Sequence, residues 1–148
     1  MILAQNITIQ DTIHSRNLFS KKICSLWLSS FKHHNISLTI RIVDEFESQL
    51  LNNKFRNINK PTNILSFLID ENPIVGDLIL CHPIIKKEAR DQNIKIKDHY
   101  AHLLIHGYLH LTGLDHEKEK NAQIMENKEI AILKKLRIKN PYKSNIIK

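Results

Sequence analysis

The order of apolar and polar residues along the chain predicts both strands and helices. Strict alternation or short apolar runs indicate strands at residues 2–9, 36–42, 64–67 and 73–81. Apolar residues that recur every three or four positions indicate helices at residues 17–33, 44–52, 97–111 and 117–135, with another after residues 82–83. We therefore expect an α+β domain in which a small mixed sheet of about four strands packs with about five helices.

Local signals support these boundaries. Asp44 is placed to cap the helix that follows it, and Pro83 falls in a first helical turn, where its missing N–H costs least. A polar loop is expected at residues 70–72, between the last two strands. The length of 148 residues fits a single domain over residues 1–148, and the pattern contains no internal repeat or interdomain linker.

Three histidines in the sequence HGYLHLTGLDH have the spacing of a metal site. His106 and His110 are one helical turn apart, so both can point at one ion. Gly113 tolerates the left-handed backbone of a helix end, which lets the chain turn back and present His116. Three imidazoles with an open fourth position are typical of catalytic zinc. We expect one zinc ion per chain, although nickel, cobalt and copper also suit three histidines.

Two further histidines lie on the same helical stripe. His99 is expected to be packed or solvated, whereas His102, one turn before His106, is a candidate for supporting a ligand or contacting substrate. The triplet also has metzincin spacing, H-E-x-x-H-x-x-G-x-x-H, but Gly107 replaces the glutamate that serves those proteases as general base. A metzincin-like metal site is therefore expected without ordinary peptide hydrolysis.

The charge is basic and unevenly distributed. The formal net charge is +7, and six basic residues follow Glu129 with no acid among them, so that about residues 138–148 read as a basic tail. Residues 50–67 also lack acids and carry Lys54, Arg56 and Lys60. These patches suit a polyanion such as RNA, although lysine-rich tails are often only solubilising.

Other compositional signals concern the compartment. Cys24 and Cys81 lack CxxC spacing and are expected to be reduced, buried thiols. No apolar run approaches the roughly 18 residues of a membrane span, and no signal peptide is evident, so we expect a cytoplasmic protein without a membrane partner. The sequence does not indicate an oligomeric state.

Four blocks of sequence resemble the YbeY family of bacterial endoribonucleases. The family hallmark H-G-x-L-H-L-x-G-x-D-H is met from His106 to His116, although Leu114 stands where members usually have tyrosine. LNNKFRNINKPTNILSF resembles a second signature and places Arg56 on the family's functionally important arginine. GDLILC and the pair Met125–Glu126 match two further blocks, so the resemblance covers about residues 36–136.

The resemblance implies a zinc-dependent, single-strand-specific endoribonuclease that matures the 3′ end of small-subunit ribosomal RNA and takes part in ribosome quality control. Its partners would be single-stranded RNA, ribosomal RNA and the ribosome or its small subunit. His106, His110 and His116 would hold zinc, which lowers the pKa of bound water toward about 7. Arg56 would hold phosphate oxygens bidentately.

The general base stays open at this stage. His102 and Asp115 are the candidates, and Asp115 equally suits orienting a ligand or capping a helix. Alternatively, the RNA 2′-hydroxyl would be the nucleophile, with zinc acting only as a Lewis acid. Lys54, Arg56 and Lys60 are expected to contact RNA phosphates, and the aromatic candidates for stacking on a base are Tyr100, Tyr108 and Phe67. Two other functions are compatible with the motif: a metallopeptidase, and a non-catalytic ribosome-assembly factor braced by zinc.

Overall fold

A four-stranded mixed sheet forms the centre of the chain. The computed structural model describes residues 5–14, 20–31, 35–71, 73–113 and 119–142. Its strands are β1 (Gln5–Asp11), β2 (Ile36–Val43), β3 (Ile64–Glu71) and β4 (Ile74–Cys81), in the order β1-β2-β4-β3. β1, β2 and β4 run parallel, and β3 is an antiparallel strand at the edge. The expected small mixed sheet is confirmed.

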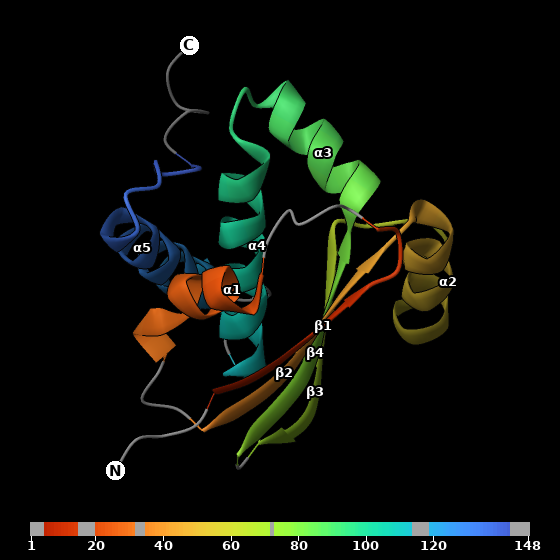
Figure 1. Cartoon of the computed structure of the whole chain (residues 1–148), viewed down its shortest axis with the longest axis horizontal. Helices are drawn as coiled ribbons and strands as arrows, with labels where there is room; N and C mark the ends of the chain where they lie inside the picture. Colours follow the sequence, from red (N-terminus) through yellow and green to blue (C-terminus); the bar gives the residue numbers. More distant parts are fainter. Residues whose placement is uncertain (1–4, 15–19, 32–34, 72, 114–118, 143–148) are drawn as a thin grey trace.

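Helices lie on both sides of this sheet. They are α1 (Lys21–Trp27), α2 (Glu45–Arg56), α3 (His82–Asp91), α4 (Ile96–Leu111) and α5 (Glu119–Lys135). In Figure 1, α1, α4 and α5 gather on one side of the sheet and α2 lies on the other, with α3 at the upper end. The predicted α+β fold with five α-helices is confirmed for the described residues.

The core is centred on α4. Ten of its 16 residues are buried, so this helix is apolar on most of its circumference and is enclosed by the sheet and the other helices. Alternate residues of β2 are buried against that layer: Ile36, Leu38, Ile40 and Ile42. A smaller apolar cluster beneath α2 contains Val43, Leu65, Ile79 and Cys81. The sheet therefore buries side chains on both faces.

Three local predictions are confirmed. The Asp44 carboxylate accepts a hydrogen bond of 2.9 Å from the Glu47 backbone N–H, which caps α2. Pro83 lies in the first turn of α3. Gly113 has φ +97° just beyond α4, a conformation that L side chains rarely adopt.

Several predicted boundaries are wrong. The helix expected at residues 44–52 continues to Arg56, and the strand expected at residues 2–9 continues to Asp11. The helix expected over residues 17–33 ends at Trp27 and is followed by a short 3₁₀ helix, Ser29–Phe31. Leu28 and Phe31 are still buried, because the tighter turn keeps the same apolar face inward. The loop predicted at residues 70–72 is longer than the one in the structure. Asp70 and Glu71 belong to β3, which continues after a register shift between Leu68 and Asp70. Their polar side chains are exposed at the sheet edge, where a strand tolerates them.

The compositional expectations agree with the fold where it is described. Cys24 and Cys81 are both free and buried. Burial raises the pKa of the Cys24 thiol to about 12, so this thiol stays protonated at neutral pH. In the described part of the chain, no helix is long and apolar enough to cross a membrane.

Candidate functional site

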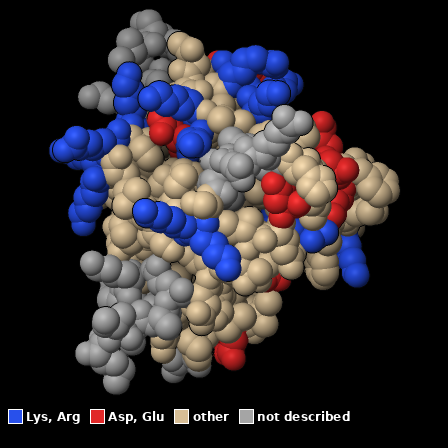
Figure 2. Space-filling view, in the orientation of Figure 1, with Lys and Arg blue, Asp and Glu red and all other residues tan. Residues whose placement is uncertain are grey.

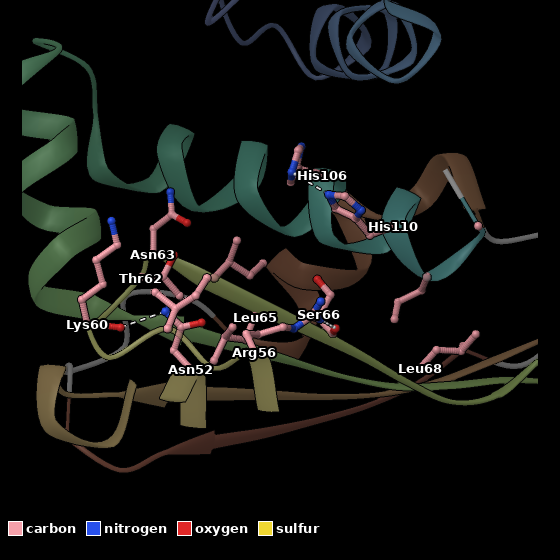
Figure 3. A pocket seen from close by; sticks show the side chains of 14 residues that line it. Asn52, Arg56, Lys60, Thr62, Asn63, Leu65, Ser66, Leu68, His106 and His110 are labelled. Atoms are coloured by element: carbon pink, nitrogen blue, oxygen red, sulfur yellow. Dashed lines mark hydrogen bonds between the residues drawn. The ribbon is translucent and has the colours of Figure 1, made fainter. Parts of the chain in front are cut away.

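An open pocket of about 590 Å³ lies where the end of α2, the edge strand β3 and α4 meet. It brings Arg56, Lys60, His106 and His110 to one place, although about 50 residues separate the first pair from the second in sequence. In Figure 3 the two histidines project from α4 above β3, and Arg56 extends beneath them toward Ser66. The arginine predicted to bind phosphate and two of the three predicted metal ligands, His106 and His110, thus line one pocket.

His106 and His110 converge as the i,i+4 spacing predicts. Their Nε2 atoms are 3.1 Å apart, and both side chains are partly buried (Figure 3). Two nitrogens that bind one tetrahedral zinc ion at about 2.0–2.1 Å are separated by about 3.3 Å. The pair is therefore already spaced as two ligands of one ion.

A buried carboxylate holds the other side of the His106 ring. Glu129 of α5 is fully buried, and its Oε1 accepts a hydrogen bond from His106 Nδ1. The hydroxyl of Tyr142 donates to Glu129 Oε2 at 2.5 Å. Burial opposes ionisation of Glu129, but contacts with His102, His106 and Tyr142 prevail and lower the pKa of its carboxyl to about 2. A charged acceptor at Nδ1 fixes the tautomer of His106 and leaves Nε2 free of a proton.

Glu129 also belongs to a second possible metal-binding group. His102, His106 and Glu129 have ligand atoms within 4.8 Å of one another and could hold an ion among the described residues. His102 Nε2 lies 3.6 Å from Glu129 Oε1 and 3.3 Å from the Tyr142 hydroxyl. Neither His102 nor Glu129 lines the pocket. The two arrangements share His106, which faces Glu129 through Nδ1 and His110 through Nε2.

Arg56 is held at the edge of the sheet. Its guanidinium donates a 2.8 Å hydrogen bond to the Ser66 carbonyl of β3, and part of the side chain remains exposed. Asn52, one turn earlier in α2, is buried and donates at 2.8 Å to the Lys60 carbonyl (Figure 3). The segment after α2 is thereby tied back to the helix. This tie places both Arg56 and Lys60 on the pocket wall.

Gly107 lies where α4 packs closely on the sheet. A Cβ atom added there would come within 2.8 Å of Ile64, 2.9 Å of Leu78 and 3.0 Å of Ser66 Oγ. No side chain fits at this position unless the helix or these residues move. A glutamate at this position, as in metzincins, would force the side chains of Ile64, Leu78 or Ser66 to shift, so glycine suits the close packing of α4 on the sheet.

The other residues singled out from the sequence lie either outside the described residues or in the core. Asp115 and His116 lie outside the described residues. His99 is buried and hydrogen-bonded to Glu88 at 2.8 Å, which confirms that it is packed. Tyr100 and Tyr108 are fully buried, so the suggestion that either stacks on a base is wrong.

Sequence reasoning missed three residues of the site. Glu129 carried a recognisable signal, because it is an acid on the buried stripe of α5 that includes Met125 and Leu133. Asn52 stood within a motif but had no role assigned from its chemistry. Tyr142 gave no signal, since it lies in the segment read as a basic tail and reaches Glu129 only through the tertiary fold.

Surface charge is arranged unevenly around the molecule. In the view of Figure 2, Lys and Arg gather around α5 and over α3, whereas Asp and Glu gather near α2. The acids of α2 lie in its first turn, Glu45 and Glu47, and the bases lie in its last turn, Lys54 and Arg56. The pocket end of α2 is thus its cationic end.

Comparisons with known proteins agree on one family. The family described as endoribonuclease YbeY matches residues 4–137. A relative from Alteromonas mediterranea, named endoribonuclease YbeY, is 42% identical over 150 residues, covering 92% of this chain and 95% of the relative. A relative of the same name from Albidiferax ferrireducens is 44% identical over 117 residues, covering 78% of this chain and 79% of the relative.

A solved structure has the same fold. The solution structure of a Thermotoga maritima protein superimposes with a TM-score of 0.57 at 24% identity, covering 90% of this chain and 92% of the other. The sequence matches span nearly the whole domain, including the helix that carries the paired histidines and the strand that anchors Arg56. This chain belongs to the YbeY family of endoribonucleases.

Proposed function

We propose that this protein is a zinc-dependent endoribonuclease that cleaves single-stranded RNA in the pocket between α2, β3 and α4. The observation that carries the proposal is the convergence of His106, His110 and Arg56 in that pocket. Membership of the YbeY family supports an RNA substrate. The finer assignment is maturation of small-subunit ribosomal RNA at its 3′ end, with a role in ribosome quality control.

The residues present fit a zinc ion on the pocket side of His106. The His106–His110 spacing suits two ligands, and His116 is proposed as the third. Glu129 is better suited to orienting His106 than to binding metal, because both of its oxygens are already engaged by His106 and Tyr142. Zinc bound there would supply Lewis acidity and would lower the pKa of a bound water toward about 7.

Arg56 and Lys60 are proposed to bind the phosphate group. Cleavage of a phosphodiester places additional negative charge on the phosphoryl oxygens as the attacking oxygen approaches and the leaving oxygen departs. A guanidinium can donate two parallel hydrogen bonds to such a group. Arg56 keeps donors available for this purpose, since a single nitrogen, Nη2, donates to the Ser66 carbonyl. Lys54 is assigned to more distant contacts with RNA, because it does not line the pocket.

Two residues are proposed as candidates for the proton acceptor. His102 lies behind His106 near Glu129, and this position favours a role in supporting His106 over direct contact with substrate. Asp115 is the other candidate. Alternatively, the RNA 2′-hydroxyl would be the attacking nucleophile, with zinc acting only as a Lewis acid. A substrate with 2′-deoxyribose at the scissile position separates the routes, because only attack by external water survives that change.

Removal of the metal tests the proposed function. Zinc-loaded protein is expected to cut a labelled single-stranded RNA and to leave the matching duplex intact. A chelator should abolish cleavage, and added zinc should restore it. Cleavage of unstructured peptides but not of RNA would instead favour the metallopeptidase. Ribosome maturation that proceeds normally with the folded, metal-free protein would favour a non-catalytic assembly factor.

Glu129→Gln is expected to weaken zinc binding by about 10- to 100-fold, the usual effect of losing a carboxylate that orients a ligand histidine. The substitution keeps the shape of the side chain but removes the charge that fixes the His106 tautomer. Affinity is measured by competition with a chromophoric chelator, independently of activity. Glu126→Gln provides the matched control, because it makes the same change on the same helix. Equal zinc affinity in Glu129→Gln and the wild type would contradict the orienting role.

A further inference from the structure

We propose that Phe55 and Phe67, with Lys54 and Arg56 beside them, form a stacking platform for one unpaired nucleobase of the RNA strand. We refer to these four residues as the aromatic platform. The inference rests on the proposed function and deepens it, because it names the feature of single-stranded RNA that the protein recognises next to the cleavage site.

Two aromatic rings meet at the surface where α2 ends. Phe55 and Phe67 have ring centroids 5.1 Å apart and planes inclined by 59°. The fold leaves Phe55 55% exposed, although full burial of a phenylalanine would contribute about 1.5–3 kcal/mol. Phe67 is partly buried and packs against the apolar cluster beneath α2. One ring is therefore anchored, while the other is supported and accessible.

Cations flank both rings. Lys54 Nζ lies 5.2 Å from the centroid of Phe55, and the guanidinium carbon of Arg56 lies 5.4 Å from that of Phe67. The surrounding segment, residues 50–67, has no acidic residue. Proteins that bind single-stranded nucleic acid combine these features, because the ring stacks on a base while the cations meet the adjoining phosphates.

The aromatic platform is continuous with the pocket through Arg56. This residue lines the pocket that contains His106 and His110, and it also lies over the Phe67 ring. Phe67 follows Ser66 in β3, and successive side chains of a strand point to opposite faces. The rings therefore lie just across the edge of β3 from the histidine pair. A strand whose phosphate contacts Arg56 would place a neighbouring base near Phe55.

Stacking at this position would favour single strands over duplexes. A base within a duplex is already stacked on both faces, and extracting it costs a few kcal/mol. An unpaired base presents a free face at little cost. The same helix contains a contrasting residue, Phe46, which is 72% exposed but lies between Glu45 and Glu47 in the acidic first turn. RNA phosphates would be repelled there.

The test compares Phe55→Leu with the wild type in cleavage of single-stranded RNA by the zinc-loaded protein. Loss of one stacking contact is expected to raise KM by about 5- to 150-fold, with little change in kcat. Phe55→Trp should keep a low KM, because indole also stacks. Phe46→Leu is the matched control and should behave as the wild type. Since Phe55 is more than half exposed, none of these changes should prevent folding.

A second substrate makes the test specific for a base. A set of RNAs is prepared in which each RNA lacks one base, at a different position around the cleavage site. For the wild type, KM is expected to rise for the RNA that lacks the stacked base. At that position Phe55→Leu should show no further loss, because the contact is already absent. Unchanged KM for Phe55→Leu would overturn the inference and leave the exposed ring for a protein partner. Failure of the wild type to cleave or bind any RNA would instead overturn the proposed function itself.

Discussion

His110→Ala is expected to reduce cleavage of single-stranded RNA by on the order of 10³-fold or more, because metal catalysis contributes several kcal/mol of transition-state stabilisation. His110 supplies one of the two imidazole nitrogens that are 3.1 Å apart in the pocket. Its loss removes a ligand while leaving the Glu129–His106 contact in place. The measurement combines cleavage rates with zinc content per chain after dialysis, and both should fall together.

A second histidine of α4 provides the control for His110→Ala. His99 is buried beside Glu88, away from the pocket, and His99→Gln keeps a hydrogen-bond donor there. This variant should retain zinc and cleave RNA at close to the wild-type rate once the folded fraction is taken into account. If zinc-free His110→Ala cleaved RNA at the wild-type rate, the activity would not depend on a metal bound by this histidine pair.

Residues that are close in sequence were the most predictable part of the site. The i,i+4 spacing of His106 and His110 fixes their convergence as soon as the segment is helical, so local geometry alone was enough. Alternation in β2 and the cap at Asp44 were predictable for the same reason. Periodicity gave less guidance at residues 28–31, because a 3₁₀ turn buries the same apolar residues as a continued α-helix.

Contacts between distant segments were not predictable from periodicity. Arg56 was singled out by its resemblance to a family motif, and the pairing of β3 with β4 and the packing of α4 on the sheet bring it to the histidines. Glu129 reaches His106 from another helix, and Tyr142 reaches Glu129 from the segment after α5. Such partners depend on how whole elements pack, which local patterns do not specify.

Gly107 affects both the packing of α4 on the sheet and the position of the histidine pair. A motif comparison with metzincins treats it as a missing glutamate, yet the structure explains it by close packing against Ile64 and Leu78. The nearness of α4 to the sheet brings the histidine pair close to the edge strand that anchors Arg56. A side chain at 107 would force the neighbouring side chains of Ile64, Leu78 or Ser66 to shift. At the position where metzincins have their catalytic glutamate, this protein has a glycine that allows close packing, and the paired histidines and an arginine line the same pocket.

Arg56→Lys is expected to lower kcat by about 10²-fold or more, the usual cost of removing one donor that stabilises developing charge in a transition state. Lysine keeps the positive charge but cannot form two parallel hydrogen bonds to a phosphoryl group. Zinc content should be unchanged, since Arg56 is not a proposed ligand. Stability should also change little, because the hydrogen bond to the Ser66 carbonyl is exposed and such bonds contribute about 1 kcal/mol.

Lys54→Met distinguishes this role from general attraction between cations and RNA. Lys54 lies two residues earlier on the same helix but does not line the pocket, so its loss should raise KM and weaken the salt dependence without lowering kcat. If Arg56→Lys also changed only KM, Arg56 would be a binding residue and not a group that stabilises the transition state. A decrease in kcat alone for Arg56→Lys and an increase in KM alone for Phe55→Leu would separate chemistry at the histidine pair from recognition of the neighbouring base.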